Sequence, residues 1–528
     1  MTVYWMVWDA AAHWIVERLV AEGALPSVRR LMDRGVRAAA RPPAPNCQTP
    51  PSLATLFTGS GPERHGITGY RVPVPAGPIG ESRSGFDRAA LLAEPVWETA
   101  GRAGLRTAAV HVPWVLDGGA APVWLDGAVE AYSRRTARHG VHELAGDRIE
   151  FEIGAARLQA VADGPLVRVS GDCGQVEVAR DWVPLRLPGG SGVWLCQAEQ
   201  AGRRTLMHTG AWVPRTAGRN RPLTKALDGA PVFAGEGLGS LYRRGALGPR
   251  LAEGGDGSSE DLFLSSVGCV HRSFAAATEV VLAGHEAELV VLYLPTTDDV
   301  GHELLGWCDP RSAAHRPDIA PAVWARLTDC YRWADALLGR VLDRAESGDT
   351  VLLSADHGMA GAAWTLHPNT VLASAGLAAV TEGRLDPHRS AVLYHPANNG
   401  SLWVNDDSRA AGRVPGGECA GLLRRAEAAL RSAAGTLLAG LTTAEDGRSA
   451  QLLFAPDCLP SAELSPDGRA IRPAAKTGAH MTNQGDDRLH AVLVAAGPGL
   501  SAGDDLGVLD NTWPAQLVLH QLAGPNRL

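Results

Sequence analysis

The chain has 528 residues, more than one ordinary core holds, so at roughly 150 residues per domain we expect a large core with insertions. Its hydrophobic share of 45% and charged share of 20% are typical of a globular protein. The net charge of -8 argues against nucleic acid polymers and anionic membranes as main partners, and no apolar run approaches the roughly 20 residues that span a bilayer.

The first ten residues, MTVYWMVWDA, lack the basic region and the small-residue cleavage site of a signal peptide. They are typical of a strand instead. The eight cysteines stand singly between Cys47 and Cys458, without a CxxC pair, which predicts neither a zinc ribbon nor a disulfide framework. We therefore expect a cytoplasmic protein, and the sequence gives no indication of its oligomeric state.

Four short apolar runs predict buried strands, at residues 3–8, 289–294, 350–353 and 491–495. None of them alternates with polar residues, which is typical of parallel strands that are covered on both faces. Apolar residues recur every three to four positions between residues 323 and 341, and again between 418 and 434, which predicts helices. Strands that alternate with helices predict a doubly wound, mostly parallel α/β core.

The middle of the chain has a different pattern. Short alternating segments from residue 149 to residue 213 predict a small antiparallel β insertion, and the Gly-, Arg- and Asp-rich stretch 217–260 is interpreted as irregular loop. We expect the region from about 120 to 265 and the one from 376 to 475 to shape the pocket. The predicted boundaries are a core in three parts (1–118, 266–375 and 476–528), a β-rich insertion with loop (119–265) and a smaller α+β segment (376–475).

Polar side chains stand where the predicted strands end or, near the C-terminus, shortly before the last strand. In an open parallel sheet, ligands bind beyond the carboxyl ends of the strands. Aspartate and histidine suit zinc, manganese or similar divalent ions. Six such side chains and one hydroxyl are too many for one tetrahedral site and suit two sites with open positions. The residues are Asp9, Asp298, His302, Asp356, His357 and His480, together with Thr49.

Local spacing supports part of this set. Asp298 and His302 are four residues apart, so one helical turn brings both to the same face, whereas Asp299 becomes the ligand if the register shifts by one. Asp356 and His357 are adjacent in a turn just past a strand, where both reach one metal. Taken singly, each residue is more often a cap, a turn residue or an ordinary histidine. The whole set at these strand ends indicates a metal site.

Thr49 opens the stretch TPPSLATLFTG, in which two prolines precede an apolar, helix-like run. Pro50 and Pro51 suit the first turn of a helix, which places Thr49 at its N-terminus. There the backbone N–H groups favour an anionic phosphate. Two interpretations of the hydroxyl remain open: it caps the helix, or it attacks a substrate.

These segments together resemble the alkaline phosphatase superfamily, in the branch of type I phosphodiesterases and nucleotide pyrophosphatases. The resemblance rests on TPPSLATLFTG followed by GPERHGITG (Gly61 to Gly69), on DDVGH and on SADHGM. It also rests on the late His480 and on Asp9 in MVWDA, which matches the family's first acidic ligand. The matching segments lie towards both ends of the chain and cover roughly half of it.

The resemblance implies two divalent metal ions, zinc before manganese, and a nucleophilic threonine. One metal lowers the pKa of the Thr49 hydroxyl, the other stabilises the leaving or bridging oxygen, and a phosphothreonine is then hydrolysed from the opposite side. Ser52, three residues further on, is a candidate for holding a phosphoryl oxygen through one hydrogen bond. The implied ligands are Asp9, Thr49, Asp356 and His357 for one metal, and Asp298, His302 and His480 for the other.

We therefore expect a two-metal phosphohydrolase that acts on a small phosphorylated substrate, either a phosphodiester or a nucleotide pyrophosphate. The sequence shows no clear equivalent of the arginine and third metal that alkaline phosphatase itself uses on monoesters, which favours diesters. A phosphomonoesterase or phosphonate hydrolase on the same scaffold is the nearest alternative. A non-catalytic metal-binding scaffold is the alternative from another class.

Other polar and aromatic residues are predicted to be structural. His65, in PERHGI, is interpreted as a turn or packing histidine, and Thr55 as a residue of the helix surface. Trp182 and Trp194 are predicted to pack in the interior rather than to stack on a substrate. Asn483 is interpreted as a loop residue rather than a substrate contact.

Overall fold

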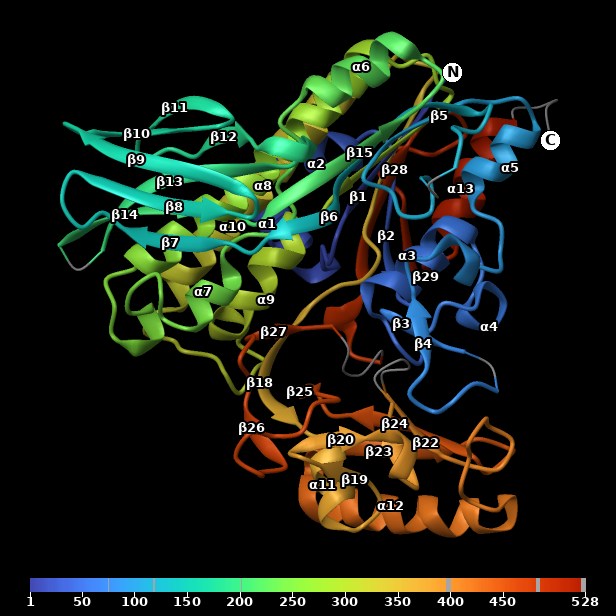
Figure 1. Cartoon of the computed structure of the whole chain (residues 1–528). Coiled ribbons are helices and arrows are strands. Elements are labelled where there is room, and N and C mark those ends of the chain that lie inside the picture. The colour runs from blue at the N-terminus through green and yellow to red at the C-terminus, as the bar shows by residue number, and fades with distance from the viewer. Residues whose placement is uncertain (75, 117–118, 201, 396–399, 481–484, 524–528) are drawn as a thin grey trace.

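A thirteen-stranded sheet forms the centre of the computed structural model, which describes residues 1–74, 76–116, 119–200, 202–395, 400–480 and 485–523. The strand order is β29-β2-β28-β17-β1-β16-β5-β6-β15-β13-β14-β7, and β12 pairs with β13. Figure 1 shows helices on both sides of this sheet and a smaller, orange region below it.

The middle of the sheet is parallel. Strand β1 (Val3–Trp8) pairs in parallel with β16 (Leu289–Leu294) on one side and with β17 (Thr350–Ser354) on the other, and β5 (Thr107–Val110) continues in parallel beyond β16. Every residue of these four strands is buried, which explains their unbroken apolar runs. Three of the four predicted strands are confirmed here in both position and direction.

Helices cover the two faces of the sheet, as the doubly wound prediction requires. The long helices α8 (Ser258–Gly284) and α10 (Ala320–Arg344) lie on one side in Figure 1. Helices α3 (Thr49–Thr58), α5 (Val96–Arg102) and α13 (Trp513–Ala523) lie on the other. The helix predicted from residue 323 to residue 341 is confirmed inside α10.

The last predicted strand, β28 (Ala491–Ala496), exists but runs antiparallel to its neighbours β17 and β2 (Val36–Arg41). The prediction of a parallel strand is therefore wrong at this position. All six residues of β28 are buried. Burial on both faces produces the continuous apolar run, and an apolar run does not encode strand direction. Strand β29 (Asp505–Asp510) closes this edge, in parallel with β2.

The β-rich region is joined to the central sheet rather than separate from it. Strand β6 (Leu125–Ala137) pairs in parallel with β5 and antiparallel with β15 (Ala211–Ala217), which starts the antiparallel half. A second, four-stranded antiparallel sheet has the order β11-β10-β9-β8. The predicted antiparallel pairing between residues 149 and 213 is thus confirmed. The remaining strands are β7 (Gly140–Glu143), β8 (Arg148–Ile153), β9 (Ala156–Asp163), β10 (Leu166–Gly171), β11 (Gly174–Val178), β12 (Val183–Arg186), β13 (Gly192–Gln200) and β14 (Arg203–His208).

The stretch 217–260 is not the irregular loop that its composition predicts. It contains helices α6 (Arg221–Gly229) and α7 (Gly239–Arg243). Asn220 caps α6 by accepting a hydrogen bond from a backbone N–H in the first turn, and Leu223 and Leu227 are buried on one face. The many glycines and charged residues obscure this short amphipathic pattern in the sequence.

The smaller region has its own apolar cluster and its own four-stranded sheet, ordered β21-β22-β24-β23. Helices α11 (Pro368–Ser374) and α12 (Cys419–Ala434) pack beside it, and α12 confirms the helix predicted from 418 to 434. The predicted domain boundaries stay predictions. The strands here and in the segments that lead to and from it are β18 (Ala360–Leu366), β19 (Ala379–Thr381), β20 (Arg384–Asp386), β21 (Val392–Tyr394), β22 (Ser401–Val404), β23 (Leu438–Thr443), β24 (Ser449–Phe454), β25 (Asp457–Pro460), β26 (Ile471–Pro473) and β27 (Gly478–Ala479).

The remaining elements are short, apart from α9, which follows β16. None of the helices in the described parts of the chain has both the length and the apolar character of a bilayer-crossing segment. The elements are α1 (His13–Ala21), α2 (Pro26–Met32), α4 (Pro62–His65), α9 (Thr296–Cys308), β3 (Arg71–Pro73) and β4 (Ser82–Ser84).

Candidate active site

The loops that follow β1 and β17 are tied together at the end of the sheet. Asp9 directly follows β1, and the backbone then turns through Ala10 with a φ of 56°. This turn directs the Ala10 N–H to Asp356 Oδ1 at 3.1 Å, and the His357 N–H donates to the same oxygen at 3.0 Å. The Asn511 amide donates to the Asp356 carbonyl at 2.6 Å. The two loops therefore hold their carboxylates in fixed positions.

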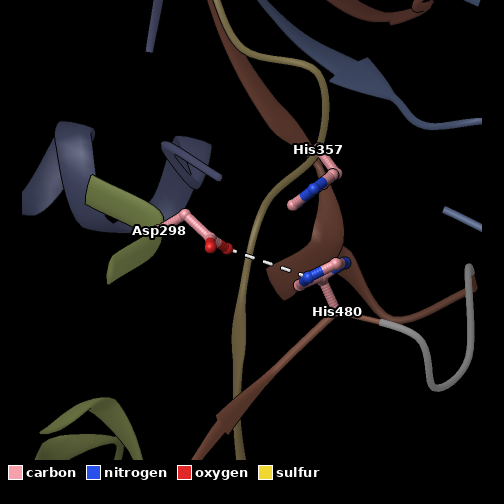
Figure 2. A group of neighbouring side chains, drawn as sticks. All are labelled: Asp298, His357 and His480. Atoms are coloured by element: carbon pink, nitrogen blue, oxygen red, sulfur yellow. Dashed lines mark ion pairs between the residues drawn. The ribbon is translucent and has the colours of Figure 1, made fainter. Parts of the chain in front are cut away.

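Helix α9 and the segment after β27 bring further ligand-type side chains to the same place. Asp298 and His302 lie one turn apart on α9, with Asp298 Oδ1 3.3 Å from His302 Nε2, as their spacing predicts. Asp298 Oδ1 is also 3.8 Å from His480 Nε2. The rings of His357 and His480 are stacked, with centroids 3.9 Å apart, and Figure 2 shows both imidazoles beside the Asp298 carboxylate.

Among the described residues, two groups of potential metal ligands result, and they share one histidine. Ligand atoms of Asp9, Asp356 and His357 all lie within 4.8 Å of one another, and so do those of Asp298, His357 and His480. His302 lies beside the second group: its Nε2 is close to Asp298 Oδ1, and its ring centroid is 5.2 Å from that of His480. The structure thus brings together all six Asp and His residues named from the sequence, with His357 between the two groups.

The three site histidines share one hydrogen-bonding pattern. In His302, His357 and His480, Nδ1 lies against a backbone carbonyl oxygen. A carbonyl only accepts, so the network assigns the proton to Nδ1 and leaves the Nε2 lone pair available. Metal-binding histidines are oriented in this way. The carbonyls belong to Gly478, Gly358 and Cys47, at 2.8, 3.0 and 3.1 Å respectively.

Several atoms that face the middle of this cluster lack hydrogen bonds. Among the described residues, Asp9 Oδ1, Asp298 Oδ1, Asp356 Oδ2 and His357 Nε2 are buried without a hydrogen-bond partner. Burial raises the pKa of the Asp9 carboxyl, and the nearby Asp356 and Asp298 raise it further, while burial lowers the pKa of His480. Unpaired buried oxygens are costly, and a cation among them removes that cost. The donor set fits zinc or manganese.

Thr49 is the first residue of α3 and lines the same cavity as Asp9 and Asp298. The capping interpretation is wrong, because Gln48 occupies the N-cap position. Pro50 and Pro51 fill the first turn as predicted. Because proline lacks an N–H group, Thr49 supplies the one backbone N–H of the first three residues of α3. The helix start therefore offers a phosphate fewer backbone donors than we expected from the sequence.

Two further predictions concern neighbours of the main residues. Ser52 is fully buried, and it is not among the described residues that line the cavity, so its role in holding a phosphoryl oxygen stays a prediction. Asp299 does line the cavity, and burial raises the pKa of its carboxyl. Asp298, however, is the residue whose carboxylate lies beside both His302 and His480. Asn483 lies outside the described residues.

The cavity has a volume of about 440 Å³, and part of its wall comes from the region between residues 120 and 265 that we expected to shape the pocket, although the individual residues were not identified from the sequence. Strands β6 and β15 contribute to this wall an ion pair between Glu130 and Arg215, 2.9 Å apart. Trp182 and Trp194 are buried in the interior, as predicted. None of the described residues between 376 and 475 lines this cavity. The aromatic residues of the wall are Tyr70, Phe86, His111, Trp114, Tyr132, Trp212 and Tyr293.

Two tyrosines in the site escaped the sequence reasoning. Tyr293 donates to Asp9 Oδ2, and Tyr70 donates to Thr49 Oγ1 at 3.1 Å. Tyr293 lies within the apolar run LVVLYL, where a tyrosine is indistinguishable from an ordinary interior residue. The available signal for Tyr70 is its place directly after Gly69, which closes the motif that follows α3.

The comparison with protein families decides the relationship of this chain. Residues 7–188 and 189–436 match the family described as type I phosphodiesterase / nucleotide pyrophosphatase. The chain belongs to this family. Its membership indicates a hydrolase of the phosphodiesterase or pyrophosphatase type. A comparison with curated proteins gives no significant match.

Solved structures align with almost the whole chain. Phosphonoacetate hydrolase from Sinorhizobium meliloti 1021, in complex with phosphonoformate, is 13% identical, with a TM-score of 0.51 over 99% of this chain and 96% of that one. Human ectonucleotide pyrophosphatase / phosphodiesterase 5 is 14% identical, with a TM-score of 0.48 over 99% and 95%. Its murine counterpart is 15% identical, with a TM-score of 0.49 over the same shares. The likeness to phosphonoacetate hydrolase shows a shared fold over almost the whole chain.

Proposed function

We propose that the protein is a metal-dependent phosphohydrolase that uses Thr49 as its nucleophile on a small phosphodiester or nucleotide pyrophosphate. One observation carries this proposal. Buried carboxylate and imidazole atoms without hydrogen-bond partners among the described residues meet in one cluster, and two of these carboxylates line a cavity together with Thr49. Family membership supports the hydrolase part, whereas the metals and the nucleophile are inferred from the side chains.

The donor set divides between two cations, with zinc the better fit and manganese the alternative. When bound, such cations lower the pKa of a hydroxyl and stabilise the oxygens that gain charge during phosphoryl transfer. The orientation of the three histidines is set before any cation binds, since their Nδ1 atoms are already held by carbonyls. Asp9, Thr49, Asp356 and His357 would hold one cation, and Asp298, His302 and His480 the other.

Thr49 Oγ1 attacks the phosphorus, and the leaving oxygen departs with the bonding electrons. A water molecule then attacks the phosphothreonine from the opposite side and releases Thr49. Asp9, Thr49 and Asp298 line the same cavity as the aromatic wall and the Glu130–Arg215 pair, and we expect this wall and pair to receive the organic part of the substrate. A volume of about 440 Å³ suits a small phosphate ester rather than a polymer.

Replacement of the nucleophile tests the proposal. Thr49→Ala is expected to lower turnover of bis-p-nitrophenyl phosphate by roughly 10³-fold or more while the protein stays folded. Thr58→Ala is the matched control, because its hydroxyl bonds to the Ala54 carbonyl on the same helix. We expect the control to keep its activity within about twofold. Wild-type turnover in Thr49→Ala would show that the nucleophile is assigned wrongly.

Substrate preference and metal content separate the alternatives. We expect faster hydrolysis of bis-p-nitrophenyl phosphate than of p-nitrophenyl phosphate or phosphonoacetate, and a strong preference for either of the latter would replace the diesterase proposal. We expect close to two metal equivalents per chain after reconstitution. Less than one equivalent, together with no turnover, would support a non-catalytic scaffold.

A further inference from the structure

Tyr70 is placed against the reacting oxygen of Thr49. Its hydroxyl donates to Thr49 Oγ1 over 3.1 Å. The side chain is half exposed and lines the cavity beside the nucleophile. Its ring packs edge-to-face on Phe86, with centroids 5.9 Å apart, and Phe86 in turn packs on Trp114 at 6.0 Å. These rings limit the directions that the Tyr70 hydroxyl can take.

The backbone of Tyr70 is anchored on both sides. Its N–H donates to Gln48 Oε1 at 3.3 Å, and Gln48 directly precedes the nucleophile. Its carbonyl accepts from the Gly85 N–H at 2.9 Å. Gly85 approaches so closely that a Cβ there would lie 2.2 Å from the Gly69 carbonyl oxygen. Backbone hydrogen bonds therefore fix the position of Tyr70 relative to the residue before Thr49, and the contact between the two side chains does not depend on the side chains alone.

We propose that Tyr70 is a catalytic residue whose hydroxyl donates a hydrogen bond to Thr49 Oγ1 as this oxygen leaves phosphorus in the second half of the reaction. The proposal rests on the proposed function, in which Thr49 forms a covalent intermediate. It gives a role to a residue outside the set of candidate ligands.

The bonds and charges balance in both halves. In the first half, the Thr49 hydroxyl loses its proton to solvent, the Oγ1–P bond forms, and the bond from phosphorus to the leaving oxygen breaks with its electron pair on that oxygen. In the second half, a water oxygen bonds to phosphorus and the P–Oγ1 bond breaks. The electron pair goes to Oγ1, where it accepts the Tyr70 hydrogen bond until a proton from the attacking water restores the Thr49 hydroxyl.

The charge on Thr49 Oγ1, which accepts this hydrogen bond, changes in opposite directions in the two halves of the reaction. Negative charge on Oγ1 falls while Thr49 attacks and rises while Thr49 departs. A donor aimed at Oγ1 therefore favours departure over attack, since catalysis comes from interactions that strengthen towards the transition state. If Tyr70 acted only by holding Thr49 in place, its loss would slow the attack instead. The fraction of covalent intermediate distinguishes the two roles.

The test is a first-turnover experiment with the zinc-reconstituted full chain and bis-p-nitrophenyl phosphate. The product of the first half, p-nitrophenol, is followed by absorbance, and the p-nitrophenylphosphoryl group on Thr49 is measured by intact mass after an acid quench. In Tyr70→Phe, we expect hydrolysis of the intermediate to slow by roughly 10- to 100-fold, and the labelled fraction of the enzyme to rise.

Tyr4→Phe is the matched control, because it also removes one tyrosine hydroxyl, here in contact with His285 Nε2 at 3.3 Å. We expect its labelled fraction to equal that of the wild type. Equal rates in Tyr70→Phe and wild type, or a labelled fraction that falls in Tyr70→Phe, would overturn the role in departure. Thr49→Ala is run in parallel: if it retains turnover, the proposed function fails, whereas an inactive Thr49→Ala with an unchanged Tyr70→Phe rejects only the present inference.

Discussion

Two regions of this molecule hold the rings of their buried histidines in opposite ways. In the turn after α3, the Ile67 N–H donates to His65 Nδ1 at 3.1 Å, and His65 Nε2 lies 3.0 Å from Thr55 Oγ1. Since Nδ1 accepts, the network assigns the proton to Nε2, which donates to Thr55, and Thr55 donates onward to the Pro51 carbonyl at 2.9 Å. Both nitrogens are occupied, so this ring is structural, as predicted.

In the cluster beyond β1 and β17, Nδ1 donates to a carbonyl and Nε2 faces the other ligand residues. His357 Nε2 has no hydrogen-bond partner among the described residues. Residue type and burial are the same in both regions. The partner of Nδ1 decides whether a buried histidine is fully bonded or has a free lone pair. Thr55 is the hydrogen-bond partner of His65 Nε2 and is buried. The prediction that Thr55 lies on the helix surface is therefore wrong.

The largest effect is expected at His357, which belongs to both ligand groups. His357→Ala is expected to lose most of both metal equivalents and at least about 10³-fold in turnover. Elemental analysis after reconstitution and steady-state kinetics measure these losses. His65→Ala is the control, with both equivalents retained. Full metal content in His357→Ala would remove the distinction between the two kinds of histidine.

His480→Ala is expected to have a smaller effect, since His480 belongs to one ligand group. We expect the loss of about one metal equivalent and a fall in turnover of about 10²-fold, part of which returns when excess zinc is added. Titration with zinc under kinetic measurement tests this. If both equivalents were lost together, the two groups would act as one site.

His65→Ala is expected to change stability and not metal content. The substitution removes a buried ring with hydrogen bonds at both nitrogens, so the free energy of unfolding should fall by about 2 kcal/mol. Urea unfolding followed by circular dichroism gives this value. A stability equal to that of the wild type would mean that the bonded turn contributes nothing.

The smallest expected effect concerns pH. Burial lowers the pKa of His65 from 6.5 to about 4. Below pH 6.5 the unfolded chain therefore binds a proton that the folded chain does not, so the free energy of unfolding falls as the pH drops towards 4. By pH 5.5 this loss amounts to about 1 kcal/mol. His65→Gln, which cannot titrate, should show a shallower decline in chelator-treated protein. Parallel pH profiles of the two proteins would show that His65 does not contribute.

Much of the fold was predictable because its signals are local. The apolar runs identified all four core strands, the periodicity of residues 323–341 and 418–434 identified α10 and α12, and the spacing of Asp298 and His302 placed both on one helical turn. The direction of β28 was not predictable, since burial on both faces looks the same for either direction. Helix α6 was missed because the signal of a short helix is small beside its polar neighbours.

Some residues of the candidate site were also predictable from the sequence, and others were not. The candidate metal ligands were recognisable because six aspartates and histidines stand together at or near the ends of predicted strands, in segments that resemble the motifs of the family. The Thr49–Tyr70 contact, the Glu130–Arg215 pair and the aromatic wall had no comparable signal. Tyrosines, tryptophans and ion pairs occur throughout a protein of this size, and their chemistry depends on what they face.

The amino-acid sequence by itself determined which elements form and which side chains stand at their ends, because hydrophobic periodicity and residue type act over a few neighbouring positions. Only the tertiary structure decided which of these ends meet. Residues as distant as Asp9 and His480 come into one cluster through strand pairing and through carbonyl contacts from remote segments, such as that of Cys47 with His480. Such contacts depend on the summed packing of the whole chain, so no single segment specifies them.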